Sequence, residues 1–204
     1  MKIEKVVVGP LQTNCYLLWD KFQTIIIDPG AEPEKIFSLI ASPVKKIICT
    51  HAHPDHVGAV WAIKHEFPQA KFLIHQGDLP VLKKTVKNPP KPDEFIKEGK
   101  FSVFPATAGP RLGGGRFQFS VIHTPGHSPG GICLLGKNCL FTGDTLFAQG
   151  IGRTDYPLGN KQEMIQSLKK LTKLPKNLTI YPGHGLATSL GQSLEWLQEL
   201  PQAW

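Results

Sequence analysis

The stretch Thr50-His51-Ala52-His53-Pro54-Asp55-His56 decides how this chain is interpreted, because it places four potential metal ligands within six residues. His51 and His53, two apart in extended backbone, project to the same side of a strand. Asp55 and His56 follow where the chain is expected to turn into a helix, so all four side chains can be aimed at one small volume. Imidazole and carboxylate ligands suit zinc, and also iron or manganese. The stretch therefore predicts a metal site at the end of a strand.

Three further candidate ligands, His127, Asp144 and His184, share one feature of the sequence. Each follows a predicted strand beside a glycine turn, within Thr-Pro-Gly-His (124–127), Thr-Gly-Asp (142–144) and Pro-Gly-His (182–184). In open α/β sheets, sites form at the carboxyl ends of strands. We therefore expect these three side chains to meet the ligands of residues 51–56.

The number of candidate ligands predicts two metals. Seven ligands are too many for one tetrahedral zinc ion, but they suit two divalent metals that share a bridging carboxylate. Asp144 is the expected bridge, and zinc is the metal expected first, with iron or manganese as alternatives. One metal would be held by His51, His53 and His127, and the other by Asp55, His56 and His184.

The four cysteines argue against a structural zinc site, the main alternative for such a cluster. Structural sites are usually completed by cysteine thiolates. No cysteine belongs to a Cys-x-x-Cys pair, and Cys49, which lies next to the first ligands, is expected to point into the core. The amino-terminal apolar run is too short for a signal peptide, and no segment reaches transmembrane length. We expect a reduced cytoplasmic protein without a membrane partner.

The chain is basic, with 23 Lys and Arg against 16 Asp and Glu and a formal net charge of +7. A basic surface raises the local concentration of anionic partners. An acidic metabolite, a nucleic acid or a membrane surface would each fit the charge alone. No basic stripe interleaved with aromatic residues is present, so a nucleic-acid partner is not expected.

Short β-rich runs alternate with helical periodicity along the chain, which predicts an α/β fold in a single domain, residues 1–204. Strands are predicted at residues 6–8, 16–19, 24–27, 46–50, 71–74, 117–123, 132–135, 139–142 and 178–181. Helices are predicted at residues 33–40, 57–66, 161–171 and 190–200, and from residue 79 onward. Residues 86–98, with three prolines, are predicted as a loop, either a lid or a solvated connection. The glycine-rich residues 109–115 are predicted as a turn.

These motifs closely resemble those of the metallo-β-lactamase superfamily. The order His-x-His-x-Asp-His, a lone His, an Asp after Thr-Gly and a final His after Pro-Gly matches that family from about residue 12 to residue 185. The resemblance implies an αβ/βα sandwich, in which two mixed β-sheets face each other and helices cover the outer faces. It also implies that Asp28, in Ile-Asp-Pro-Gly, supports the metal ligands from behind.

Within that superfamily the chain is similar to the glyoxalase II group of hydroxyacylglutathione hydrolases. The similar motifs are Thr-Pro-Gly-His-Ser-Pro-Gly (124–130), Phe-Thr-Gly-Asp-Thr-Leu-Phe (141–147) and Gly-Arg-Thr-Asp (152–155). Full-length members carry a carboxyl-terminal helical extension that helps to bind glutathione. Here twenty residues follow His184, so we expect no separate glutathione-binding domain, and the substrate stays open.

The resemblance implies hydrolysis of a small anionic thioester such as S-lactoylglutathione. Two metals would generate a bridging hydroxide that attacks the carbonyl carbon, while a metal stabilises the oxyanion. Asp55 would orient this nucleophile as well as bind metal. Arg153 would contact a substrate carboxylate or, equally, form an internal ion pair with Asp155 or another acid.

Other functions of the same fold remain as alternatives. A persulfide dioxygenase would need one iron, held by two histidines and Asp144. A nuclease or a lactonase is less favoured, and β-lactam hydrolysis is disfavoured by the missing secretion signal. The other histidines, His65, His75 and His123, are interpreted as surface or packing residues.

Overall fold

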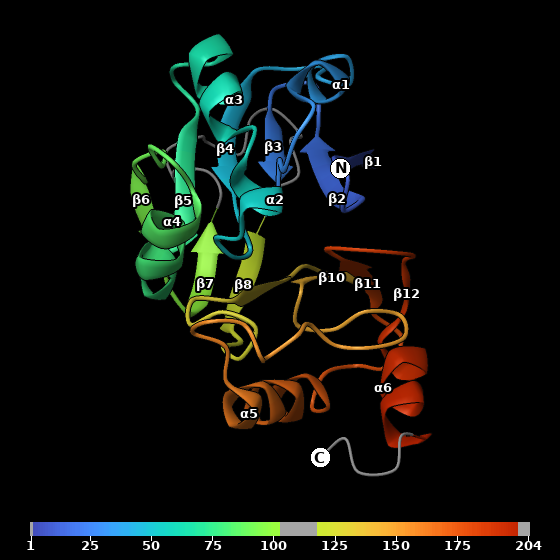
Figure 1. Ribbon diagram of the computed structural model, residues 1–204. Coiled ribbons are helices and arrows are strands. Elements are labelled where there is room, and N and C mark those ends of the chain that lie inside the picture. The colour runs from blue at the N-terminus through green and yellow to red at the C-terminus, as the bar shows by residue number, and fades with distance from the viewer. Residues whose placement is uncertain (1, 103–117, 200–204) are drawn as a thin grey trace.

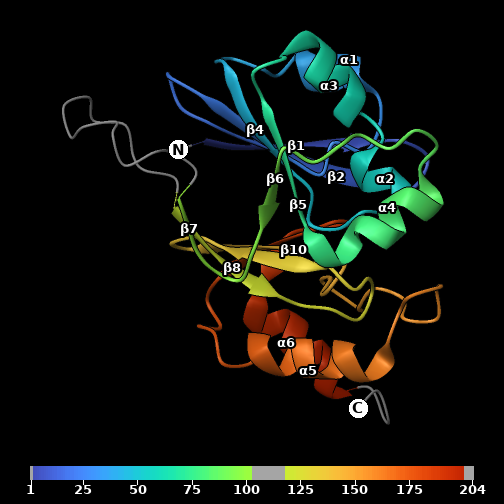
Figure 2. The ribbon, with the colours of Figure 1, turned by 90° about the vertical axis from the view of Figure 1, so that its left-hand side faces the viewer.

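The computed structural model describes residues 2–102 and 118–199, which form four layers. Two sheets face each other in the middle, and helices lie outside each sheet (Figures 1 and 2). The α/β class and the αβ/βα sandwich that the resemblance implied are therefore confirmed.

The first sheet has the strand order β1-β2-β3-β4-β5-β6. β1 to β3 pair in antiparallel fashion, and β3 to β6 pair in parallel. Its strands are β1 (Lys2–Val8), β2 (Thr13–Trp19), β3 (Thr24–Ile27), β4 (Val44–Ile48), β5 (Lys71–His75) and β6 (Glu94–Ile96).

The second sheet has the order β12-β11-β10-β9-β8-β7, and only β10 and β11 are parallel neighbours. Consequently β8, β10 and β11 all run in the same direction. Its strands are β7 (Gly99–Ser102), β8 (Gln118–His123), β9 (Ile132–Leu135), β10 (Cys139–Gly143), β11 (Thr179–Pro182) and β12 (Thr188–Ser189).

The helices fall into two groups, one for each sheet, as Figure 2 shows with α1 and α3 at one end and α5 and α6 at the other. The first group is α1 (Pro33–Phe37), α2 (Pro54–Val57), α3 (Val60–Glu66), the 3-10 turn η1 (Gln76–Asp78) and α4 (Leu79–Thr85). The second group is α5 (Lys161–Leu171) and α6 (Leu190–Glu199). No described helix is long and apolar enough to span a membrane.

The unbroken apolar run of β3 is explained by burial on both of its faces. Ile25 and Ile27 pack between the two sheets, where they join residues such as Phe141. Ile26 points the other way, into the cluster beneath α1 to α4. Each fully buried side chain of this size stabilises the fold by about 1.5–3 kcal/mol. The alternation fixes the strand register, because a shift by one residue would exchange the two faces.

Three predictions about local structure are corrected. Residues 86–98 are not wholly a loop, since β6 lies within them, and Asp93 accepts a hydrogen bond from the Phe72 backbone just before that strand. The helix predicted over 57–66 begins later, as α3 at Val60, since Val57 ends α2 and the Ala59 amide donates to the Pro29 carbonyl. The short strands β7 and β12 were not predicted. Residues 109–115 and residue 200 lie outside the described part of the chain.

Candidate metal centre

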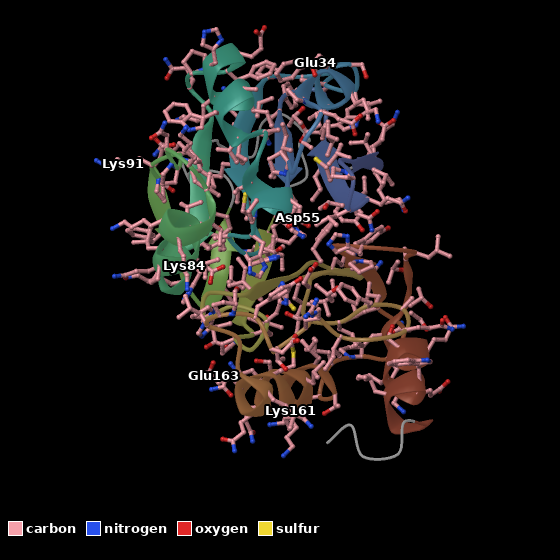
Figure 3. All side chains as sticks on the ribbon, in the orientation of Figure 1. Glu34, Asp55, Lys84, Lys91, Lys161 and Glu163 are labelled. Atoms are coloured by element: carbon pink, nitrogen blue, oxygen red, sulfur yellow. The ribbon has the colours of Figure 1, made fainter. Side chains whose placement is uncertain are left out.

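Five strands deliver polar side chains to one edge of the sandwich. Asp28 follows β3 and the ligands of residues 51–56 follow β4, which is parallel to β3. On the second sheet, His127, Asp144 and His184 follow β8, β10 and β11. Figure 3 shows Asp55 at α2, where the two halves of the sandwich meet. The carboxyl ends of both sheets therefore converge, as the sequence predicted.

The convergence creates three overlapping groups of potential ligands, which we call together the metal cluster. Within each group the candidate ligand atoms all lie within 4.8 Å of one another. The groups are His51, His53 and His127; His51, His56 and Asp144; and Asp55, His56 and His184. The outer two groups coincide with the two ligand sets expected from the sequence, and the middle group contains the expected bridge.

The first outer group consists of three imidazoles, and its members His51 and His53 are held neutral. His53 Nδ1 lies 2.8 Å from His127 Nε2. Burial and the nearby His127 lower the pKa of His53 to about 4. Burial also lowers the pKa of His51 well below its usual range, helped by repulsion from His56. Neutral rings keep the nitrogen lone pair that a metal needs.

The second outer group contains one carboxylate and lies beside the carboxylates of Asp144 and Asp28. Asp55 Oδ2 lies 3.4 Å from His56 Nε2 and 3.3 Å from His184 Nε2. Burial lowers the pKa of His56, but the carboxylates of Asp144 and Asp28 outweigh it and raise the value to about 9. Hydrogen bonds to Asp144 and Asp55 likewise outweigh burial and raise the pKa of His184 to about 10. This half of the cluster favours bound positive charge, which a divalent cation would supply.

Hydrogen bonds on the far side of each ring fix how the histidines point. His127 Nδ1 donates to the Arg153 carbonyl at 2.7 Å, and His184 Nδ1 donates to the Leu11 carbonyl at 3.0 Å. Because a carbonyl only accepts, the proton sits on Nδ1 and the Nε2 lone pair faces the cluster. Both rings are thus oriented as metal ligands usually are.

Asp28 holds His56 from behind, as the resemblance implied. Its carboxylate accepts hydrogen bonds from the Thr50 amide and hydroxyl, both at 2.7 Å. Asp28 Oδ2 lies 3.1 Å from His56 Nδ1. The carboxylate therefore connects the end of β3 to the segment that carries the first four ligands.

Two buried polar atoms of the cluster are free to contact a further group. His51 Nε2 and Asp144 Oδ1 have no hydrogen-bond partner among the described residues. Leaving such atoms unpaired costs about 1–3 kcal/mol each. Asp144 also lies within 3.6 Å of His56, His127 and His184. Imidazole and carboxylate donors around a shared aspartate fit two divalent metals.

The backbone of Gly183 lies close to the side chains of Asp144 and His56 in the metal cluster. A Cβ atom added there would overlap Asp144 Oδ1 and lie 2.7 Å from His56 Cε1. The position must therefore remain a glycine if Asp144 is to reach both outer groups.

Asp78 is a residue that sequence reasoning missed. Its fully buried carboxylate accepts hydrogen bonds from the Ala52 amide at 2.7 Å, the Ser128 hydroxyl at 2.9 Å and the Gly130 amide. It therefore links residues 51–53 to residues 127–130, the two segments that carry the first outer group. An aspartate just before a helix usually indicates an N-cap, so the sequence holds no signal for this role.

The metal cluster forms the floor of a cavity of about 550 Å³. Its other walls are mainly apolar, from α4 on one side and residues 147–158 on the other. The apolar lining residues are Leu11, Pro54, Val81, Phe147, Ile151, Pro157 and Leu158. The cavity is large enough for an elongated small molecule whose reactive carbonyl rests on the floor.

Arg153 lines the cavity, but its charge is engaged elsewhere. Its guanidinium forms a two-point ion pair with Asp155, at 2.9 and 2.8 Å, and lies 4.4 Å from the Tyr156 ring centroid. The internal ion pair, which was one of the two predicted roles, is thus present.

The remaining histidines lie outside the metal cluster. His75 and His123 stack on each other with ring centroids 4.2 Å apart, and His65 is exposed on α3. All three have the packing or surface positions that the sequence indicated.

Comparison with known sequences identifies the family of the chain. Residues 8–184 match the profile of the Metallo-beta-lactamase superfamily. The hydroxyacylglutathione hydrolase GloC of Haemophilus influenzae is 35% identical over 204 residues, which cover 94% of each chain.

Two solved structures have the same fold along nearly the whole chain. The B3 metallo-beta-lactamase BLEG-1 superposes with a TM-score of 0.79 and 32% identity, covering 95% of this chain and 97% of that one. A protein crystallised in a di-iron-bound form superposes with a TM-score of 0.77 and 34% identity, covering 94% and 96%.

Proposed function

The chain belongs to the metallo-β-lactamase superfamily, and from that premise we propose that it is a two-metal hydrolase of small anionic thioesters such as S-lactoylglutathione. The observation that carries the proposal is the pair of outer ligand groups with Asp144 between them. The similarity to a hydroxyacylglutathione hydrolase of H. influenzae supports the substrate class, and the similarity to a di-iron structure supports two metals.

The donor set defines which residues would hold the metals. His51, His53 and His127 would bind one, Asp55, His56 and His184 the other, and Asp144 both, with zinc, iron or manganese as the ions. When bound, such a pair lowers the pKa of a shared water toward ~7 and polarises a carbonyl oxygen.

Asp55 is the residue best placed to orient the attacking water. Its carboxylate lines the cavity and accepts a hydrogen bond from the Thr13 hydroxyl at 3.1 Å. Although burial raises the pKa of Asp55, hydrogen bonding to His184 and the charge of His56 outweigh it and keep the group ionised. An ionised carboxylate accepts a hydrogen bond from water and thereby aims an oxygen lone pair at the substrate.

A thioester also makes few demands on proton transfer by the residues of the cavity. Thiolate is a good leaving group, so a dedicated proton donor is not required. The four cysteines are buried, and burial raises the pKa of each thiol. They therefore remain protonated and weakly nucleophilic, which leaves water as the attacking group.

We also propose that the chain acts as a single domain. Both sheets contribute to the metal cluster, and the apolar core between the sheets joins residues from both halves of the sequence. Neither half could hold two metals alone.

A β-lactam ring is the second candidate substrate, because BLEG-1 shares nearly the whole fold at 32% identity. A cyclic amide carbonyl could rest on the same floor as a thioester carbonyl. We rank it second because GloC shows a similar identity over a similar length and is a thioester hydrolase by name.

Substrate assays on the metal-loaded chain test the proposal. S-lactoylglutathione, a chromogenic cephalosporin and glutathione persulfide with oxygen would be supplied in parallel. We expect thioester turnover that falls more than about 100-fold in His56→Ala and persists in His65→Ala, a matched change of an exposed histidine. Ring opening of the cephalosporin alone would favour the second candidate, and oxygen consumption alone would favour a persulfide dioxygenase.

A further inference from the structure

One face of α4 forms a wall of the cavity. Val81, Lys84 and Thr85 all line it, and their i, i+3 and i+4 spacing places them on the same side of the helix. Leu82 and Val81 also pack into the core beneath the first sheet, where both are buried. The register of α4, fixed by that core contact, therefore presents one lysine to the substrate space.

Lys84 is the cation of this wall whose charge is not matched. Among residues 2–102 and 118–199, no carboxylate forms an ion pair with it. Arg153, on the opposite wall, is paired with Asp155 through two hydrogen bonds. Figure 3 shows Lys84 on α4, on the same half of the molecule as Asp55. An anion entering the cavity would thus find a free charge at α4.

Most of the other residues on the two walls of the cavity are apolar. Val81 continues the α4 wall, and Phe147, Ile151 and Leu158 face it from the other side. Because Arg153 is already paired with Asp155, Lys84 is the wall cation that can offer its charge to an anion.

We infer that Lys84 binds the anionic thiol carrier of the substrate, through a carboxylate or a phosphate, while the acyl group packs against Phe147, Ile151 and Leu158. The inference rests on the proposed thioester hydrolysis and adds which end of the substrate lies at α4. Lys84 is then a specificity-determining residue, and the anionic contact expected for Arg153 moves to the other wall.

Three thioesters that share the same acyl group but differ in the thiol carrier show how much the charge of the carrier contributes to binding. Lactoyl thioesters of glutathione, coenzyme A and N-acetylcysteamine carry carboxylates, phosphates and no charge, respectively. Steady-state KM and kcat would be measured on the metal-loaded chain and on Lys84→Met, Lys84→Arg and Lys83→Met. Lys83 is a matched control, because it is also exposed on α4 but does not line the cavity.

We expect Lys84→Met to raise KM for the preferred charged thioester about tenfold, the loss of one hydrogen bond to a charged group. The kcat, and both constants for the uncharged thioester, should not change. Lys84→Arg should restore most of the affinity, and Lys83→Met should resemble the unaltered chain. The effect should shrink in high salt. Preference for glutathione would identify carboxylate as the bound group, and preference for coenzyme A would identify phosphate.

The opposite results are equally clear. Equal KM changes for charged and uncharged thioesters, or equal effects of Lys83→Met and Lys84→Met, would overturn the inference while thioester hydrolysis stands. If the unaltered chain hydrolyses none of the three, the proposed function fails first, and the role of Lys84 fails with it. The uncharged thioester and the melting temperature report independently whether each variant is folded.

Discussion

The floor and the walls of the cavity are built in different ways. On the floor, His51, His56 and His127 are at most 7% exposed, and the ring of each is held on its far side by a hydrogen bond or an ion pair. On the rim, Leu11, Tyr156 and Leu158 are between 42% and 64% exposed. The floor is rigidly specified and suits a fixed reaction. The walls are open and apolar, so they can vary the substrate without disturbing the chemistry.

The largest loss of activity and of bound metal should come from changing Asp144, the candidate ligand that lies near both outer groups. Asp144→Ala removes the carboxylate that lies near both outer groups and leaves His56 and His184 without its charge. We expect more than a 100-fold loss of kcat/KM and a metal content below two per chain, since even changes behind a ligand cost about 10–100-fold. Elemental analysis and thioester assays on one sample would check this. Unchanged metal content would contradict the shared position of Asp144.

A smaller loss of metal affinity is expected when Asp78 or Asp28 is changed, because these residues hold the ligands without belonging to the outer groups. Asp78→Asn keeps the size of the side chain but removes its negative charge and one acceptor oxygen. The three hydrogen bonds from Ala52, Ser128 and Gly130 would then be weakened. The ligands of the first outer group should be held less firmly as a result. We expect its metal affinity to fall about 10–100-fold while the second group keeps its ion. Asp28→Asn changes a residue that contacts His56. It should therefore weaken metal binding at the second outer group and leave the first group less affected. Competition with a chelator would measure both, and equal losses at both groups would indicate general destabilisation instead.

Changes in the walls should leave the metals bound. Phe147→Ala removes apolar contact from the cavity, and we expect KM for a bulky acyl thioester to rise about 5–10-fold, equivalent to ~1–1.4 kcal/mol. Metal content and kcat for a small acyl group should remain as they were. A fall in metal content would show that floor and wall are not independent.

The smallest change in KM should come from a variant that releases the Arg153 guanidinium from its ion pair. Asp155→Asn frees the Arg153 guanidinium from its ion pair. Because an exposed pair contributes only about 0.2–1 kcal/mol, KM for an anionic thioester should fall by about twofold. A rise in KM would mean that Asp155 itself contacts the substrate.

The metal ligands could be predicted from the sequence because the motifs that mark them are short and contiguous. Residues 51–56 carry four ligands side by side, and His127, Asp144 and His184 each follow a strand and a turn. Such signals need no knowledge of distant contacts, so the convergence of these side chains could be predicted. The αβ/βα architecture came from the family resemblance, whereas the residues alone indicated only α/β elements.

What could not be predicted depends on contacts between distant segments. Asp78 receives hydrogen bonds from residues 26, 50 and 52 positions away. β6 lies in a stretch rich in proline and lysine, and its Glu94 pairs with Lys71 of the neighbouring strand β5 and with Lys46 of β4. The direction of Lys84 depends on the register of α4. None of these leaves a periodic or motif signal in the chain.

Metal titration of the metal-free chain tests the central claim most directly. Zinc would be added in measured equivalents while bound zinc and thioester hydrolysis are followed on the same sample. Two metals on a shared aspartate predict binding up to two equivalents, with activity that appears mainly as the second site fills. Full activity at one equivalent, or saturation at one ion per chain, would contradict a two-metal floor.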